Sequence, residues 1–321
     1  MARCLFFALL SAAVVCTGAY MFGTCPAQDS PRVSDLPALD KDGRNFAFAD
    51  DSDFEKMKTP KPGDWLDAYD EPGQSFSQYS NSNPNKPDKK HTTIYLQPIG
   101  LFTDEEKELL SKLEEFTKIF FQMPVVLKTA VALPDAEEYK RTRTSGNKKW
   151  VQYRTDFFLE KVLQPALPDD AFCYLGITMK DLYPDDEWNY VFGQASLKER
   201  VGVYSLARYF PEFWGQKDTD ESRILSLRRS CETLVHETGH MFNMLHCIYY
   251  ECVMAGSNSM DEADRRPLHE CPVCLRKLQW NTGFDANKRY EQLEKFCRDN
   301  KLDKEADWMK KRMEKIKSAV K

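Results

Sequence analysis

The sequence predicts an α+β fold whose N-terminal half is α/β-like. Three observations indicate it: a strand, a helix and a strand follow one another from residue 91, a long helix occupies about residues 222–243, and two amphipathic segments close the chain. The 321 residues, 42% of them hydrophobic, suffice for one sizeable domain with appendages or for two small domains. The formal charge of −5 argues against a nucleic-acid partner, because no basic excess can neutralise phosphates.

Residues 1–27 are expected to be a signal peptide or a signal anchor. The uncharged stretch over residues 4–26 contains the apolar run LFFALLSAAVV, and a cleavage near Ala27 fits a secretory signal. The same stretch is just long enough to span a bilayer. This predicts a secreted or extracytoplasmic protein, which meets a membrane only if the segment is retained as an anchor. An intracellular location is the alternative, since the chain has no Asn-x-Ser/Thr acceptor.

Residues 28–90 are expected to form an extended linker arm. They are poor in apolar clusters and rich in Asp, Ser, Pro and Asn. Trp65, Leu66 and Tyr69 could still attach part of this arm to the body of the protein. A propeptide is the alternative interpretation.

The main domain is expected over residues 91–286, and it begins with a β-α-β unit. Residues 93–97 combine β-branched and aromatic side chains, which favours a strand. Thr103 and Glu106 form a capping box that opens a helix with apolar residues at helical spacing. Residues 125–133 are expected to be the second strand.

Alternating elements continue to the end of the chain. The next predicted elements are a helix over residues 153–163 and strands over residues 172–178, 190–195 and 201–207. The helix from about residue 222 to 243 turns apolar residues inward. Residues 287–321 space their apolar side chains as two amphipathic helices that pack on the domain.

The string HETGHMFNMLH predicts a catalytic zinc site. His236 and His240 are four residues apart, so they share one face of a helix and can bind one ion. Asn243 tolerates the left-handed conformation that ends a helix, so the chain can turn back and deliver His246. Three neutral nitrogens with an open fourth position are typical of catalytic zinc. Glu237, about 100° further round the helix, is expected to act as general base towards a zinc-activated water.

A second metal site is predicted just after the first. Its candidate ligands form a C-x₄-C pair and a C-x₂-C pair joined by eighteen residues: Cys247, Cys252, Cys271 and Cys274. This pattern suits a closed structural zinc, and two disulfides are the competing interpretation. We therefore expect two Zn²⁺ per chain. His269 is expected in an exposed loop, and Cys173, Cys231 and Cys297 as buried small hydrophobic residues.

The block HETGHMFNMLHCIYYECVM with the later CPVC resembles the archaemetzincins, a branch of the metzincin zinc peptidases. The similarity extends to TIYLQPIG and FGQASLKERVGVYSLARY, although Asn243 stands where the family usually has glycine. The resemblance implies a metzincin-type mixed β-sheet with helices, an active-site helix under the sheet, and a C-terminal subdomain braced by zinc. It also implies that residues 91–286 are the catalytic domain and that Met254 lies in a turn beneath the histidines.

The resulting prediction is a monomeric zinc-dependent metallopeptidase that cleaves peptides or proteins. The FGQAS segment is expected to be an edge strand to which a peptide could add. Tyr249 and Tyr250 are close enough in sequence to hold an oxyanion, but packing roles are favoured. The alternatives are a catalytically weak zinc-binding interaction module and a zinc hydrolase of a non-peptide amide.

Overall fold

The computed structural model describes residues 50–135, 137–196 and 198–319. The expected signal peptide or anchor over residues 1–27, and the arm up to residue 49, lie outside these residues. Within the described part of the chain, no helix has both the length and the apolar character needed to cross a membrane.

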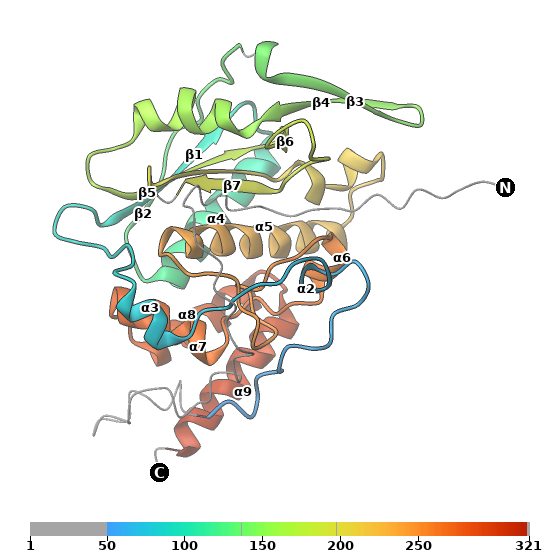
Figure 1. Ribbon diagram of the computed structural model, residues 1–321. Coiled ribbons are helices and arrows are strands. Elements are labelled where there is room, and N and C mark those ends of the chain that lie inside the picture. The colour runs from blue at the N-terminus through green and yellow to red at the C-terminus, as the bar shows by residue number, and fades with distance from the viewer. Residues whose placement is uncertain (1–49, 136, 197, 320–321) are drawn as a thin grey trace.

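A five-stranded mixed sheet is the centre of the fold, with strand order β2-β1-β5-β8-β7 (Figure 1). Its strands are β1 (Thr93–Ile99), β2 (Val125–Leu127), β5 (Ala171–Thr178), β7 (Gly193–Ser196) and β8 (Val201–Ser205). All pairings are parallel except that of β7, which lies antiparallel to β8 at one edge. Every residue of β5 is buried, because this central strand is covered on both faces.

Helices α4 (Asp104–Phe121) and α5 (Asp220–Met241) cover one face of the sheet. α4 begins at the predicted capping box of Thr103 and Glu106, and α5 begins at a similar box formed by Thr219 and Ser222. α5 runs directly beneath the sheet (Figure 1). The expected mixed sheet with a helix under it is therefore confirmed.

The other face of the sheet is covered by η3 (Phe157–Leu163), a π-helix that a 3₁₀ turn, η4 (Gln164–Ala166), continues. A second sheet lies beside it, with order β3-β4-β6. Its strands are β3 (Lys140–Ser145), β4 (Lys148–Arg154) and β6 (Asp181–Tyr183). β3 and β4 form an antiparallel hairpin. This hairpin was not predicted from the sequence, because its charged and hydroxyl side chains show no apolar alternation.

Several predicted boundaries are wrong. Residue 153 belongs to β4, so the helix expected from that position begins four residues later. β2 ends at Leu127, and beyond it only Val131 forms an isolated bridge, to Ile99. The strands expected over residues 190–195 and 201–207 are the shorter β7 and β8. Short 3₁₀ turns complete this half of the chain: η2 (Glu137–Tyr139), η5 (Ala207–Tyr209) and η6 (Pro211–Trp214).

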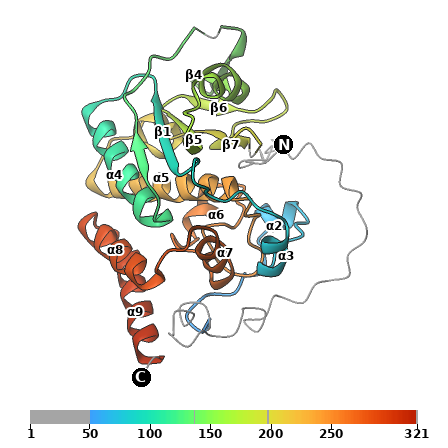
Figure 2. The ribbon, with the colours of Figure 1, turned by 90° about the vertical axis from the view of Figure 1, so that its left-hand side faces the viewer.

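The C-terminal helices pack on the side of α5 that faces away from the sheet (Figure 2). They are α6 (Met260–Asp264), α7 (Pro272–Thr282), α8 (Ala286–Asp299) and α9 (Asp303–Ala319). α8 and α9 are the two expected amphipathic helices, and their apolar residues, such as Leu293 and Met309, join the main core. α6 and α7 were not predicted.

The described part of the arm, residues 50–90, packs against the domain. It contains α2 (Trp65–Ala68) and α3 (Phe76–Asn81). Phe54, Trp65 and Tyr79 are buried, so the expectation of an extended linker is wrong for this stretch. A composition average over a polar segment conceals single aromatic residues that attach it to the body. The suggested attachment through Trp65 is confirmed.

Candidate functional site

The three histidines of the HETGHMFNMLH string converge beneath the sheet. His236 and His240 lie on one face of α5, which ends at Met241. Asn243 adopts the predicted left-handed conformation, with φ of 61°, and the chain turns back to bring His246 beside the other two rings. The three ring centroids lie 4.7, 5.0 and 5.3 Å from one another.

Each imidazole is fixed through its Nδ1 atom. His236 Nδ1 lies 2.8 Å from the carbonyl oxygen of Val253, and His240 Nδ1 lies 2.7 Å from that of Met244. His246 Nδ1 lies 2.8 Å from Oε1 of Glu71. Because an acceptor faces each Nδ1, the proton belongs there and each Nε2 keeps its lone pair for a metal.

This geometry fits a zinc ion. One ring nitrogen from each histidine lies within 4.8 Å of those of the other two. His236 Nε2 and His240 Nε2 are 3.1 Å apart, close to the about 3.4 Å expected for two nitrogens on a tetrahedral zinc. Burial and the neighbouring rings lower the pKa of His236 well below its usual range and that of His240 to about 3. The imidazoles of His236 and His240 are therefore neutral, as metal binding requires.

Glu237 lies on α5 between the two helical ligands and faces the edge of the sheet. A Cβ placed on Gly193 of β7 would lie 3.3 Å from the Cδ atom of Glu237. The carboxyl group is buried, and its Oε2 has no hydrogen-bond partner among the described residues. Burial raises the pKa of Glu237 to about 8. The site thus holds a carboxyl group with a free oxygen.

A pocket of about 530 Å³, measured to its open mouth, lies beside His236 and Glu237. Phe192 and Tyr209 contribute aromatic walls, and their rings stack with centroids 5.2 Å apart. Charged walls come from Arg229 and Asp264, which form an ion pair of 2.6 Å. The pocket thus places aromatic and charged side chains beside the histidine site.

Met254 lies against α5 at the level of the histidines. A Cβ on Gly239 would approach its Sδ to 2.5 Å, so any larger residue here would require the Met254 side chain to shift. The backbone N–H of Cys247 donates to the carbonyl of Met254 at 2.8 Å, and Val253 anchors His236. The turn around Met254 therefore supports the histidine site from below, as the resemblance implies.

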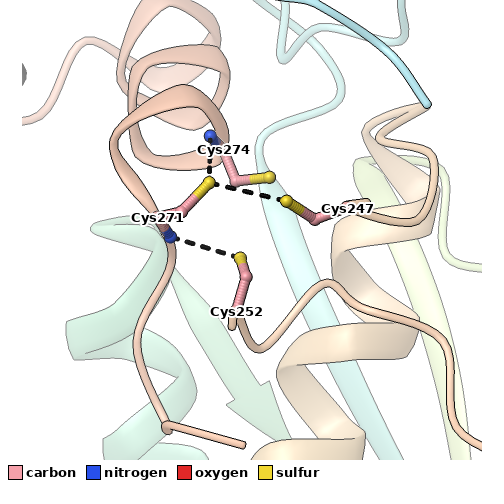
Figure 3. Close-up of side chains that lie close together, drawn as sticks. All are labelled: Cys247, Cys252, Cys271 and Cys274. Carbon is pink, nitrogen blue, oxygen red and sulfur yellow. Dashed lines mark hydrogen bonds between the residues drawn. The ribbon is translucent and has the colours of Figure 1, made fainter. Parts of the chain in front are cut away.

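The four clustered cysteines form a second candidate metal centre (Figure 3). Cys271 and Cys274 lie at the start of α7, whereas Cys247 and Cys252 come from the loop after His246. All four sulfurs lie within 4.8 Å of one another, and those of Cys247 and Cys271 are 3.6 Å apart. Two sulfurs on a tetrahedral zinc would be about 3.8 Å apart.

The chemistry around these sulfurs favours a bound cation. The neighbouring thiols lower the pKa of the Cys247 thiol well below its usual value, whereas burial raises the pKa of Cys252 and Cys271. Backbone N–H groups donate to the sulfurs of Cys252 and Cys271. The cysteines of the described residues are free, so the disulfide interpretation does not hold here.

Other residues singled out by the sequence take structural roles. His269 is buried and stacks on Trp308 with centroids 3.4 Å apart, so the expected exposed position is wrong. The hydroxyl of Tyr250 donates to Asp51 at 2.7 Å, which supports the packing role. The expected burial of the remaining body cysteines is confirmed for Cys173, Cys231 and Cys297. Glu71 was missed, because nothing in the polar arm marks a single carboxylate as a partner of a histidine.

The chain is similar to known proteins over most of its length. Residues 102–280 match the model of peptidase family M54. Over 286 residues the chain is 37% identical to archaemetzincin-2 of Homo sapiens and 36% identical to that of Pongo abelii, covering 81% of this chain and 79% of each relative. Archaemetzincin-1 of Homo sapiens is 32% identical over 72% of this chain and 51% of its own length. The crystal structure of archaemetzincin from Methanopyrus kandleri is 27% identical, covers 62% of this chain and 99% of its own, and gives a TM-score of 0.47.

Proposed function

Because this chain belongs to the archaemetzincins, the zinc-dependent metallopeptidases of family M54, we propose that it hydrolyses peptide bonds with Glu237 as general base. The observation that carries this proposal is the convergence of three imidazoles beside a buried carboxyl group with a free oxygen. His236, His240 and His246 are the proposed ligands of the catalytic zinc. A peptide or protein is the proposed substrate.

The proposed chemistry divides between the metal and the chain. Bound at three neutral imidazoles, zinc supplies Lewis acidity that lowers the pKa of water and polarises a carbonyl group. Glu237 accepts the proton of the attacking water at its free Oε2 and returns it to the leaving amine. Its burial supports this role, because burial raises the pKa of the carboxyl group towards neutral pH, where a proton acceptor can also return the proton.

β7 supports a proposal for how the substrate is placed. The strand lies at the edge of the five-stranded sheet, and Gly193 at its start approaches the Glu237 carboxyl group. An edge strand has unpaired backbone groups along one side, so an extended peptide can add there by main-chain hydrogen bonds. The scissile bond would then pass over Glu237, and one side chain would enter the neighbouring pocket.

The cysteine cluster is the proposed site of a second, structural zinc. Four sulfurs complete a tetrahedral site and leave no position for a substrate. Cys247 follows His246 directly, so this ion would hold the end of the loop that carries the third histidine. The proposed content is therefore two zinc ions per chain.

Replacing Glu237 tests the proposed mechanism. Glu237→Gln keeps the shape of the side chain but removes the proton acceptor, so peptide cleavage is expected to fall by about 10²- to 10⁴-fold. The zinc content should stay at two per chain. Cleavage of a peptide library, followed by mass spectrometry, measures the first quantity, and metal analysis of the purified protein measures the second.

His240→Ala provides the matched comparison. It removes a proposed ligand rather than the base, so both cleavage and one of the two zinc ions should be lost. Wild-type rates in Glu237→Gln would refute the assignment of the base. Two zinc ions in His240→Ala would refute the assignment of the metal site.

A further inference from the structure

The arm, residues 50–90, is hydrogen-bonded at several points to the loop that carries His246. It lies outside residues 102–280, the segment that matches the family model. Its first part pairs with the stretch between the first two cysteines. Met57 N–H donates to the carbonyl of Tyr249 at 3.0 Å, and the N–H of Glu251 donates to the carbonyl of Glu55 at 2.9 Å. The arm is thus hydrogen-bonded to backbone groups close to both metal centres.

The last part of the arm holds the turn at the end of α5. The side chain of Gln74 donates to the carbonyl of Asn243 and accepts from the N–H of Leu245, both at 3.2 Å. The hydroxyl of Tyr79 donates to the carbonyl of Phe242 at 2.9 Å. These bonds satisfy backbone groups that the end of a helix leaves free. The conformation of the turn that delivers His246 therefore depends on the arm.

Trp65, in the middle of the arm, occupies a seat shaped for it. A Cβ on Gly256 would lie 2.6 Å from the indole ring, so only glycine leaves room for the ring there. The backbone N–H of Trp65 donates to both carboxylate oxygens of Glu262, at 3.0 and 3.1 Å. The indole also meets the ring of His246 edge-on, with centroids 5.0 Å apart.

The carboxylate of Glu71 lies between Trp65 and His246. Its Oε1 accepts from the indole Nε1 of Trp65 at 2.8 Å and from Nδ1 of His246 at 2.8 Å. The side chain of Glu71 is only 19% exposed, and that of His246 only 8%. The indole of Trp65 therefore fixes Oε1 of Glu71, and this oxygen in turn orients the imidazole of His246.

This anchor differs from those of the other two histidines. His236 and His240 bond backbone carbonyls that belong to the domain itself, those of Val253 and Met244. Only His246 uses a charged side chain, and that side chain comes from a position 175 residues earlier. A carboxylate bound to the distal nitrogen makes an imidazole a more basic ligand and fixes its tautomer.

We propose that Glu71 is a positioning residue for His246, and that the arm thereby controls how tightly the histidine site binds its metal. This inference rests on the proposed function for the identity of the site, but it concerns metal affinity rather than cleavage. Loss of such an outer partner weakens metal binding about 10- to 100-fold. The arm is thus a component of the metal site.

The test compares Glu71→Ala, Glu71→Gln and the wild-type full chain. Zinc affinity is measured by competition with a chromogenic chelator, with the weaker of the two sites assigned by its loss in His240→Ala. Glu71→Ala should bind zinc about 10- to 100-fold more weakly at the histidine site. Glu71→Gln should be intermediate, because its amide oxygen can still accept from His246 but carries no charge. Affinity at the cysteine site should not change.

Cobalt substitution and a neighbouring residue separate positioning from folding. The visible spectrum of Co²⁺ at the histidine site should change in Glu71→Ala, whereas the thiolate-to-cobalt bands of the cysteine site should persist as evidence of a folded loop. Asp70→Asn is the matched control, since Asp70 is exposed and adjacent to Glu71. It should behave as wild type in both assays.

The outcomes separate this inference from the proposed function. Unchanged affinity and an unchanged cobalt spectrum in Glu71→Ala would overturn the inference, even if the protein cleaves peptides. The inference would also be overturned if Asp70→Asn lowered the zinc affinity as much as Glu71→Ala does, since the loss would then reflect only the removed negative charge. If the Glu71 variants lose zinc affinity in the expected order but the wild-type protein cleaves no peptide, the inference is supported and the proposed function is refuted.

Discussion

Gly256 shows how a single missing side chain determines where the arm can lie. The indole ring of Trp65 passes so close to this residue that a Cβ would overlap three of its atoms. A ring cannot bend away as a flexible side chain does, so Trp65 would have to leave its seat. The loss of stability caused by a larger residue at position 256 therefore reports how strongly Trp65 holds the arm to the domain.

Gly256→Ala should displace the arm without changing any ligand or charge. We expect a loss of about 1–3 kcal/mol in the free energy of unfolding, because the added methyl group overfills a packed site. Backbone amides around Trp65 and Glu71 should exchange hydrogen faster, as measured by mass spectrometry. In a Trp65→Ala background the same substitution should cost less than about 0.5 kcal/mol, since the clash is then absent. An equal loss in the free energy of unfolding in both backgrounds would contradict the close contact between Trp65 and Gly256.

At this scale the sequence predicted the three histidines that the fold brings together, but not the groups that orient them. The four-residue spacing of His236 and His240 and the turn-forming Asn243 act locally, so they can be recognised in the sequence. The acceptors of the three Nδ1 atoms come from the loop after α5, which supplies Met244 and Val253, and from the arm, which supplies Glu71. Glu71 is 175 residues from its partner, and no local pattern encodes such a pairing.

The loop that follows α5 joins the two candidate metal centres, because it carries His246 as well as Cys247 and Cys252. His246 and Cys247 are consecutive, and Cys247 is hydrogen-bonded to the backbone of Met254, which supports α5 from below. A movement of the cysteine cluster is therefore transmitted to a histidine ligand through a single peptide unit. The structural ion would thus contribute to the geometry of the catalytic site.

Cys274→Ser should reduce the zinc content from two ions to one and also lower the peptidase activity. Serine keeps the size of the side chain but is a poor zinc ligand, so the loop loses its bracing ion. Metal analysis and peptide cleavage measure the two effects, and the melting temperature should fall. Cys297→Ser is the control, because Cys297 is equally buried but lies outside the cluster. Full activity with one zinc would show that the centres act independently.

Among the elements, those with a strong apolar period were predictable. α4 repeats its buried residues at helical spacing, and β5 is buried at every position. β3 and β4 are largely polar and half-exposed, so their pairing depends on the hairpin rather than on an apolar pattern. α7 begins at Cys271 and Pro272, where the metal motif obscures the start of a helix.

For the molecule as a whole, the two centres differ in their access to solvent. His236 is partly exposed at the edge of a pocket, whereas the four cysteines are at most 3% exposed. The cysteine centre is enclosed between the loop, α7 and the arm. Exchange of an ion bound at the cysteines would therefore require opening of the fold, whereas exchange at the histidine centre would not.

Chelation should therefore remove the two zinc ions in separate steps. A small chelator is expected to abolish cleavage first, with one zinc released and the circular dichroism spectrum unchanged. The second zinc should leave more slowly and together with a loss of helical signal, because a structural zinc contributes directly to folding. Metal release, activity and circular dichroism recorded on one sample measure the order. Simultaneous loss of all three would contradict it.

The long separation between Glu71 and His246 has a consequence for synthesis of the protein on the ribosome. At about 5–20 residues per second, roughly 10–35 seconds pass between the appearance of these two residues. During this time the backbone N–H of Trp65 and the hydroxyl of Tyr79 lack the partners that they bond in the folded protein, since those partners lie after position 240. The nascent chain therefore cannot assemble the three histidines and Glu71 before residue 246 has been synthesised, so shorter nascent chains lack the complete histidine site.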